Sequence, residues 1–168
     1  MKRIFSLALA AAFLIASLAA CGGSSDGGQD KQVNLAEFAQ TLLENHEFPM
    51  LDRLDPTDAE FGATMLENAY PGLKDMDLAQ TEVYMAMISF SGGELALVQT
   101  KNTGDAAKVK EIFDARVTAK TTEGPGNYPE EVEMWLRSSA VVSNGNYVML
   151  VNHEDSEAIV SEFNALFS

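Results

Sequence analysis

An Asn-Gly pair between two apolar runs, Asn144-Gly145, constrains the fold of this chain more than any other feature of its sequence. Such a pair is the strongest short-range signal for a β-hairpin, because a type I′ turn needs a positive φ at both of its central residues. The flanking runs cover residues 140–143 and 146–152. We therefore predict two antiparallel strands joined by a tight turn near the end of the chain.

A second hairpin is predicted earlier in the chain, with its turn at residues 91–93 (Ser-Gly-Gly). The strand before this turn covers residues 81–90 and is apolar on both faces, which is typical of an interior strand. The returning strand covers residues 94–100. A helix follows each hairpin, over about 105–121 in the first case and from Asp155 onward in the second, so the pattern β-β-α occurs twice.

Other helices are predicted from capping residues and apolar spacing. Asn34 is a good N-cap, and Glu37 stands three residues later, as in a capping box. A short helix over residues 59–69 is expected to face Phe61, Met65 and Leu66 inward, and Pro129 suits the first turn of another helix. The predicted fold class is α+β, with a four-stranded antiparallel sheet made from the two hairpins and helices packed against it.

The first 21 residues are typical of a bacterial lipoprotein signal peptide. Lys2 and Arg3 provide the charged start, residues 4–17 are largely apolar, and Leu-Ala-Ala-Cys at 18–21 resembles a lipobox. The alternative is a transmembrane helix, for which a span of about 17 residues is the short limit. We expect residues 1–20 to be the signal peptide and Cys21 to become the new N-terminus.

Lipidation of Cys21 would make the bilayer the first partner of the protein. The cysteine is expected to carry diacylglycerol, whose two acyl chains anchor a protein stably where one chain is marginal. Residues 21–32 then form a flexible Gly/Ser-rich linker, and the ten residues 22–31 reach roughly 15–20 Å. Residues 33–168 are expected to form one extracytoplasmic domain at the cell membrane.

Charge and cysteine content exclude several classes of function. The chain carries 11 basic and 25 acidic residues, a net charge of −14. This balance argues against a nucleic-acid partner, because binding to phosphates needs clustered Lys and Arg. The single cysteine excludes an internal disulfide framework and an all-cysteine metal site.

Catalytic and metal-binding motifs are not found in the sequence. His46 closes an apolar helical stripe and His153 follows the last predicted strand, without the spacing of a metal-binding pair. Neither a nucleophile elbow nor a phosphate-binding glycine loop occurs. Three aspartates with a spacing of three residues do not form an EF-hand and are interpreted as turn formers and caps: Asp52, Asp55 and Asp58. We expect no enzyme activity, no cofactor and no metal.

Arg116 is the most unusual candidate site residue. It lies on the apolar stripe of the helix over residues 105–121, where a guanidinium must either be paired or extend to the rim of the core. The favoured interpretation is a rim arginine whose stem covers the core. The alternative is an anchor for a carboxylate, either internal or on a ligand, in a groove that three aromatic residues could line: Tyr128, Trp135 and Tyr147.

Three segments carry a resemblance to a known family. They are GELALVQTKNTGDAAKVKEIFDAR (Gly93–Arg116), NYPEEVEMW (Asn127–Trp135) and VVSNGNYVMLV (Val141–Val151). Together with the lipobox they resemble the domain-of-unknown-function 4358 family of small bacterial lipoproteins, over roughly residues 35–168. The resemblance implies a surface lipoprotein and brings no catalytic residues with it.

The sequence therefore favours a membrane-anchored lipoprotein whose domain binds a protein or a small ligand at the cell envelope without catalysis. The alternative is a small-ligand-binding lipoprotein that serves a transporter, although about 136 folded residues are too few for two lobes. A hydrolase is less favoured, since no nucleophile–base pair is visible.

Overall fold

The computed structural model describes residues 32–87, 93–122 and 128–168, and all of them belong to one folded unit. The predicted signal peptide, Cys21 and nearly all of the linker lie outside the described residues. The helices are α1 (Leu35–Asn45), α2 (Gly62–Ala69), α3 (Ala106–Thr121), α4 (Pro129–Ser138) and α5 (Ser156–Ala165). The strands are β1 (Leu51–Arg53), β2 (Leu78–Ala86), β3 (Glu94–Thr100), β4 (Ser139–Asn144) and β5 (Tyr147–Asn152).

The five strands form one antiparallel sheet in the order β1-β2-β3-β5-β4. The mixed α and β composition and the two β-β-α units agree with the sequence pattern, but the predicted four strands are one too few. The additional strand, β1, pairs with β2 through Leu51, Asp52 and Arg53. Three residues are too short to show the alternation by which a strand is recognised in a sequence.

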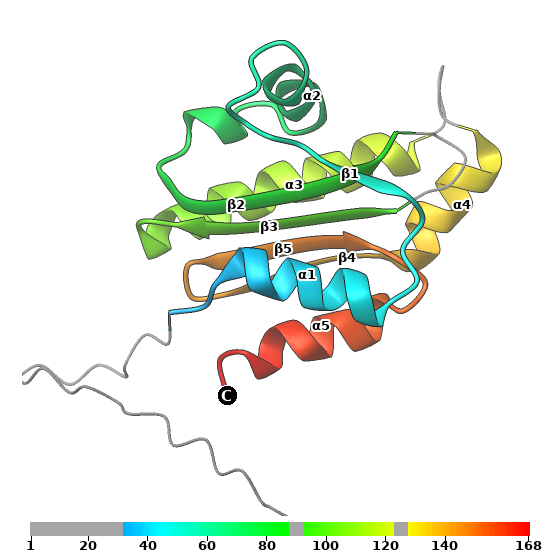
Figure 1. Ribbon diagram of the computed structural model, residues 1–168. Helices are drawn as coiled ribbons and strands as arrows, with labels where there is room; N and C mark the ends of the chain where they lie inside the picture. Colours follow the sequence, from blue (N-terminus) through cyan, green and yellow to red (C-terminus); the bar gives the residue numbers. More distant parts are fainter. Residues whose placement is uncertain (1–31, 88–92, 123–127) are drawn as a thin grey trace, which may run out of the picture. The chain divides into compact units, whose positions relative to one another are not determined.

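Both faces of the sheet are covered by helices, so the domain has three layers (Figure 1). In β3, Ala96 and Val98 pack under α2, α3 and α4, whereas Leu95 and Leu97 pack under α1 and α5. We call these two sides the α3 face and the α1 face. Successive side chains of a strand point to opposite faces, which explains why the interior strands carry runs of consecutive apolar residues such as Leu95–Val98.

Capping residues determine where α1 and α2 begin, and α2 begins later than the sequence predicts. The side chain of Asn34 accepts hydrogen bonds from the backbone N–H groups of Ala36 and Glu37, which confirms the predicted N-cap. In the second case Asp58 accepts from the N–H of Phe61, and the helix begins only at Gly62. Phe61 is therefore half-exposed, and its predicted inward position is wrong. A Cβ on Gly62 would lie 2.0 Å from the carbonyl oxygen of Asp55, so only glycine fits there.

The turn between β4 and β5 lies one residue later than predicted. Asn144 pairs with Tyr147 at the end of the ladder, so the two turn residues are Gly145 and Asn146. Gly145 has a φ of 57°, and among the described residues only glycines have a positive φ. A positive φ at the first central position alone fits a type II′ turn, so the predicted type I′ geometry is wrong although the hairpin is present.

No helix within the described residues combines the length and the apolar character that crossing a membrane requires.

Candidate ligand-binding site

Arg116 is a largely buried residue that holds an internal carboxylate. It projects from α3 onto the start of β3, where its Nε donates to Glu94 Oε1 at 2.9 Å and its Nη2 donates to Glu94 Oε2 at 2.7 Å. Only 13% of the Arg116 side chain and 3% of the Glu94 side chain are exposed. The rim position that the sequence favoured is therefore wrong, and the alternative of an anchor for an internal carboxylate describes the residue.

Two aromatic rings enclose this ion pair. The guanidinium carbon of Arg116 lies 5.8 Å from the ring centroid of Tyr70 and 5.6 Å from that of Trp135, within the range of a cation–π contact. The hydroxyl of Tyr70 donates to Glu94 Oε1. Both oxygens of Glu94 are thus engaged by donors from α3 and from the segment after α2.

The pKa shifts of this cluster follow from burial and from the charge of Glu94. Burial and the nearby carboxylate raise the pKa of Tyr70 well above its ordinary value, so the phenol stays neutral. Burial by itself lowers the pKa of Arg116, but the hydrogen bonds to Glu94 outweigh it and the pKa is raised. Arg116 therefore keeps its positive charge in this partly enclosed position.

A second ion pair lies beside the first, between α3 and α4. Lys120 Nζ contacts Glu131 Oε1 at 2.6 Å, and Glu131 is only 5% exposed although it lies in the first turn of α4. The other carboxylate oxygen, Oε2, is buried and has no hydrogen-bond partner in the described part of the chain. A buried carboxylate oxygen without a donor is costly in free energy, so this atom marks a position where a donor is missing.

The two ion pairs line a pocket of about 240 Å³ on the α3 face. Its polar lining is Asn68, Glu94, Arg116, Lys120 and Glu131. Its apolar lining comes from Trp135 and from Met65, Ala69, Met85, Ala86 and Met87, with Gly93 at the hairpin. Helices α2, α3 and α4 and the β2–β3 hairpin all contribute, so the pocket exists only in the folded domain.

The structure separates the aromatic residues that the sequence grouped around Arg116. Trp135 lines the pocket, as expected. Tyr147 lies on the α1 face, where its hydroxyl accepts from the N–H of Val33 at 3.1 Å and its ring packs 5.0 Å from that of Phe167. Tyr128 is half-exposed just before α4 and is not among the described residues that line the pocket. The expected groove thus contains Arg116 and Trp135 without the two tyrosines.

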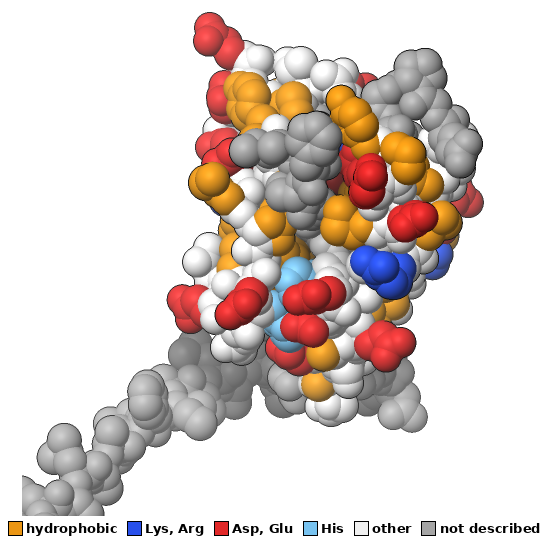
Figure 2. All heavy atoms as spheres, turned by 90° about the vertical axis from the view of Figure 1, so that its right-hand side faces the viewer, with side chains coloured by type: hydrophobic (Ala, Val, Ile, Leu, Met, Phe, Trp, Pro, Cys, Tyr) orange, Lys and Arg blue, Asp and Glu red, His pale blue; other side chains and the backbone are white. Residues whose placement is uncertain are grey.

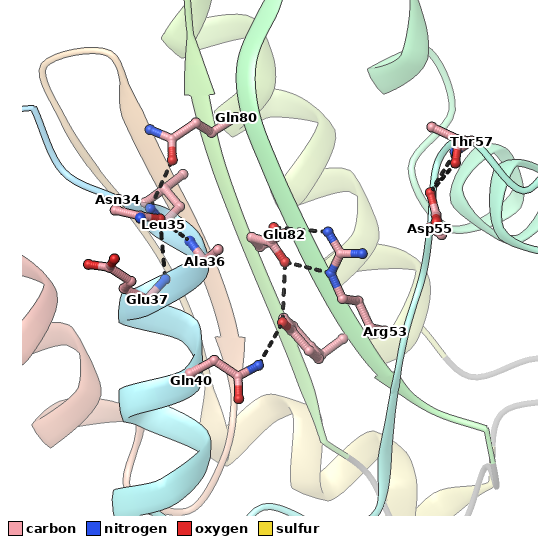
Figure 3. Close-up of polar contacts among 11 residues, drawn as sticks. Asn34, Leu35, Ala36, Glu37, Gln40, Arg53, Asp55, Thr57, Gln80 and Glu82 are labelled. Atoms are coloured by element: carbon pink, nitrogen blue, oxygen red, sulfur yellow. Dashed lines mark hydrogen bonds and ion pairs between the residues drawn. The ribbon is translucent and has the colours of Figure 1, made fainter.

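A similar polar cluster lies on the α1 face, between α1 and the edge of the sheet (Figure 3). Arg53 Nε donates to Glu82 Oε2 at 2.8 Å and Arg53 Nη2 donates to Glu82 Oε1 at 3.0 Å. The hydroxyl of Tyr84 donates to Glu82 at 3.2 Å and accepts from Gln40 at 3.4 Å. Here 45% of the Arg53 side chain and 10% of the Glu82 side chain are exposed.

The two histidines meet, although 107 residues separate them in the sequence. Their ring centroids are 5.9 Å apart, at the end of α1 and after β5. His46 Nδ1 lies 3.2 Å from Asp155 Oδ2, and His46 Nε2 lies 2.9 Å from Glu162 Oε1. Burial alone lowers the pKa of His46, but the hydrogen bonds to Glu162 and Asp155 raise it above its ordinary value. Figure 2 shows histidine side chains among carboxylates on this side of the domain.

Sequence reasoning missed four residues of the pocket and its frame: Tyr70, Glu94, Lys120 and Glu131. Glu94 carried one usable signal, because a charged residue at the start of a strand that is otherwise buried needs a partner. Glu131 carried the opposite signal, because an acidic residue in the first turn of a helix is ordinarily explained by the helix dipole alone.

Comparison with known proteins gives one match. The model of a family described as a domain of unknown function, DUF4358, matches residues 54–153, which is 100 of the 168 residues. The matched segment includes both ion pairs and the two aromatic rings that enclose Arg116, whereas His46 and Asp155 lie outside it. No curated protein and no solved structure matches the chain.

Proposed function

The chain belongs to the DUF4358 family, and we propose that it is a membrane-anchored lipoprotein whose extracytoplasmic domain binds a small polar ligand, without catalysis, in the pocket beside Glu131. The proposal has two parts, the ligand site and the lipid anchor. Each part rests on its own observation and has its own test.

The observation that carries the ligand site is the unpartnered oxygen of Glu131. An ionised carboxylate is stable in a buried position only when donors surround it. Lys120 satisfies Oε1, and Oε2 of the same pocket-lining side chain is buried without a donor among the described residues. A ligand that donates an N–H or O–H group would complete the shell of Glu131, and the hydrogen bond would be strengthened by its charge.

The shape of the pocket limits the ligand to a small molecule. A volume of about 240 Å³ lies below the usual range for drug-sized ligands and equals roughly eight water molecules in the liquid. Trp135 and three methionines provide an apolar wall, and methionine adapts to ligands of irregular shape. Lys120 can donate to an acceptor on the same molecule. The ligand is therefore a small compound that carries a donor, an acceptor and an apolar part.

The chemistry of the lining favours binding over catalysis. Both oxygens of Glu94 are occupied by Arg116 and Tyr70, so this carboxylate is not available as a base. The described residues of the lining include no hydroxyl, thiol or imidazole group that could act as a nucleophile. The Arg116–Glu94 pair instead fixes the distance between α3 and β3 at the back of the pocket.

Hydrogen bonds to the first residues of the domain support the proposal of a lipid anchor. Gln80 accepts from the N–H of Leu35 at 2.9 Å and donates to the carbonyl of Val33 at 2.8 Å. The hydroxyl of Tyr147 accepts a hydrogen bond from the N–H of Val33. Side chains of the sheet thus bind the backbone from residue 33 onward, which leaves the twelve positions from Cys21 to residue 32 as the linker between lipid and domain.

The ligand site is tested with the full-length protein, because Trp135 is the only tryptophan of the chain and lies in the pocket wall. We expect one class in a panel of amino acids, amines and sugars to change its fluorescence below about 1 mM. Glu131→Gln, which keeps the volume and removes the charged acceptor, should weaken that response at least tenfold. Glu133→Gln, an exposed change on the same helix, should not. An equal response in both variants would place the ligand elsewhere.

The anchor is tested by replacing Cys21. We expect Cys21→Ala to leave the precursor without lipid and poorly released from the membrane, because the thiol is the only point of attachment for the diacylglycerol. Growth with radiolabelled palmitate, followed by purification of the protein, measures this directly. Equal labelling of the variant and the wild type would exclude the anchor and leave the ligand site untouched.

A further inference from the structure

A cluster on the α1 side of the domain has no part in the pocket, and we propose that it binds a divalent transition-metal ion of the zinc class through His46, His153 and Asp155. These residues come from three segments, the end of α1, the residue after β5 and the start of α5. One ligand atom from each lies within 4.8 Å of the other two. The fold therefore brings two imidazoles and a carboxylate to one point.

The distances are close to those of a tetrahedral site. Zinc bonds of about 2.0–2.2 Å place neighbouring ligand atoms roughly 3.3–3.5 Å apart. His46 Nδ1 lies 3.2 Å from Asp155 Oδ2, and His153 Nδ1 lies 4.0 Å from the same oxygen. The Asp155 side chain is half-exposed and can rotate, whereas both imidazoles are buried. A small movement of the Asp155 side chain would bring its carboxylate and the two imidazoles to bonding distance from one ion.

Glu162 supplies the outer contact that metal-binding histidines ordinarily have. Its Oε1 lies 2.9 Å from His46 Nε2. A carboxylate at this position keeps the proton on Nε2, orients the ring and leaves the Nδ1 lone pair for a metal. Glu162 is on α5, two turns after Asp155, so one helix provides both a direct ligand and the group that positions His46.

The imidazole ring of His153 is fixed in position by a ring contact and a hydrogen bond. Its ring lies 4.3 Å from that of Phe48, and its Nδ1 accepts the backbone N–H of Asp155 at 3.0 Å. An ion at this position would replace the contact between His46 Nδ1 and Asp155, and it would break the hydrogen bond from the Asp155 amide so that the Nδ1 lone pair of His153 becomes free. Binding therefore requires the first turn of α5 to shift, so that the Asp155 amide turns away from His153.

The ligand set selects the metal. Two imidazoles and one carboxylate suit zinc and its late first-row neighbours, whereas calcium and magnesium require mainly oxygen ligands. Three protein ligands leave a fourth position for water or for a group from a partner. The net charge of −14 draws cations toward the domain.

The test uses the full-length chain with Cys21→Ser, purified in detergent without a histidine tag, so that no thiol or added imidazole competes. Calorimetric titration with ZnCl₂ should show one ion bound per chain at micromolar concentrations. Asp155→Asn and Glu162→Gln should each weaken binding about 10–100-fold. Glu154→Gln, an exposed neighbour, is the matched control and should bind like the parent.

His46→Gln and His153→Gln should abolish the binding, and circular dichroism shows whether each variant is folded. If the variant of the buried His153 does not fold, Asp155→Asn on the exposed side decides the question alone. Failure of the parent to bind zinc, or binding that Asp155→Asn leaves unchanged, would overturn the proposal. Neither result bears on the pocket, which shares no residue with this cluster.

Discussion

Two clusters of the same three residue types lie on opposite faces of the sheet, and they differ in burial. On the α3 face Arg116 and Tyr70 bind Glu94, and on the α1 face Arg53 and Tyr84 bind Glu82. In both, the arginine uses Nε and Nη2 as a fork on the two carboxylate oxygens. The two clusters therefore have the same residue types and the same arginine–carboxylate geometry, and they differ in how far solvent reaches them.

The surroundings decide what each cluster can do. Arg116 lies between two aromatic rings and is nearly closed off from solvent, so its attraction to Glu94 is weakly screened and neither partner can be removed without stranding a charge. About half of the Arg53 side chain is exposed, so water and salt screen much of its attraction to Glu82. We conclude that the α3-face cluster is a rigid frame for the pocket, whereas the α1-face cluster ties the edge strand β1 to the sheet.

The largest effect is expected from Arg116→Ala. The substitution leaves the buried Glu94 without its counter-charge and should lower the free energy of unfolding by about 3–5 kcal/mol. The rim position that the sequence favoured predicts a loss of about 1 kcal/mol or less. Urea unfolding followed by circular dichroism separates the two values.

The double variant Arg116→Leu/Glu94→Leu sharpens this result. Removing both charges removes the stranded carboxylate, so the pair of substitutions should cost less than Arg116→Ala alone. A double variant at least as unstable as the single one would mean that packing, rather than charge, accounts for the loss.

The next effect is expected from Tyr70→Phe, which removes a buried donor to a charged acceptor. We expect a loss of about 1–3 kcal/mol at neutral pH. The raised pKa of Tyr70 means that its stabilising contribution is complete below its ordinary pKa of 10.0 and is lost as the pH rises through the value in the folded protein. Unfolding curves at increasing alkaline pH should therefore fall more steeply in the wild type than in the variant. Parallel curves would contradict a buried, neutral phenol.

A smaller effect is expected from Arg53→Ala. Because the guanidinium is half-exposed, the loss should be about 1 kcal/mol or less and should shrink further at high salt. Unfolding in urea at low and high ionic strength measures both. A loss as large as that of Arg116→Ala, and independent of salt, would erase the distinction between the two faces.

The smallest effect is expected from Tyr84→Phe. Its hydroxyl makes two long hydrogen bonds, to Glu82 at 3.2 Å and from Gln40 at 3.4 Å, next to the half-exposed Arg53. We expect a loss of roughly 0.5 kcal/mol, at the low end for a hydrogen bond in a protein. Comparing its thermal midpoint with that of Tyr70→Phe under the same conditions gives the contrast directly, and equal shifts would contradict it.

The sequence predicts what depends on neighbouring residues. The two antiparallel strand pairs, the N-cap at Asn34 and the family all follow from short segments, and each is confirmed, whereas residues 91 and 92 of the first predicted turn lie outside the described residues. The predicted type I′ turn is wrong because the turn lies one residue later in the chain. The glycine of the Asn-Gly pair therefore occupies the first central position of the turn and not the second. Strand β1 was missed because its stability comes from pairing with β2 and not from its own three residues.

The candidate site could be predicted only in part, because its partners meet through the fold. Helical spacing showed that Arg116 points inward but could not show that Glu94, 22 residues earlier, lies beneath it. The same limit applies to the two histidines and to Glu131, whose missing donor is a property of the packed pocket. Spacing along the chain identifies which side chains need partners, and only the sheet order shows which partners they obtain.

The central claim is that the frame on the α3 face holds a ligand site and its counterpart on the α1 face does not. Ligand-induced stabilisation of the full-length protein tests this most directly, with thermal unfolding of wild type, Glu131→Gln and Glu82→Gln measured against the same panel of amino acids, amines and sugars. We expect that a compound which raises the wild-type midpoint also raises that of Glu82→Gln and does not raise that of Glu131→Gln. A compound that stabilises Glu131→Gln as well as the wild type, or loses its effect in Glu82→Gln, would contradict it.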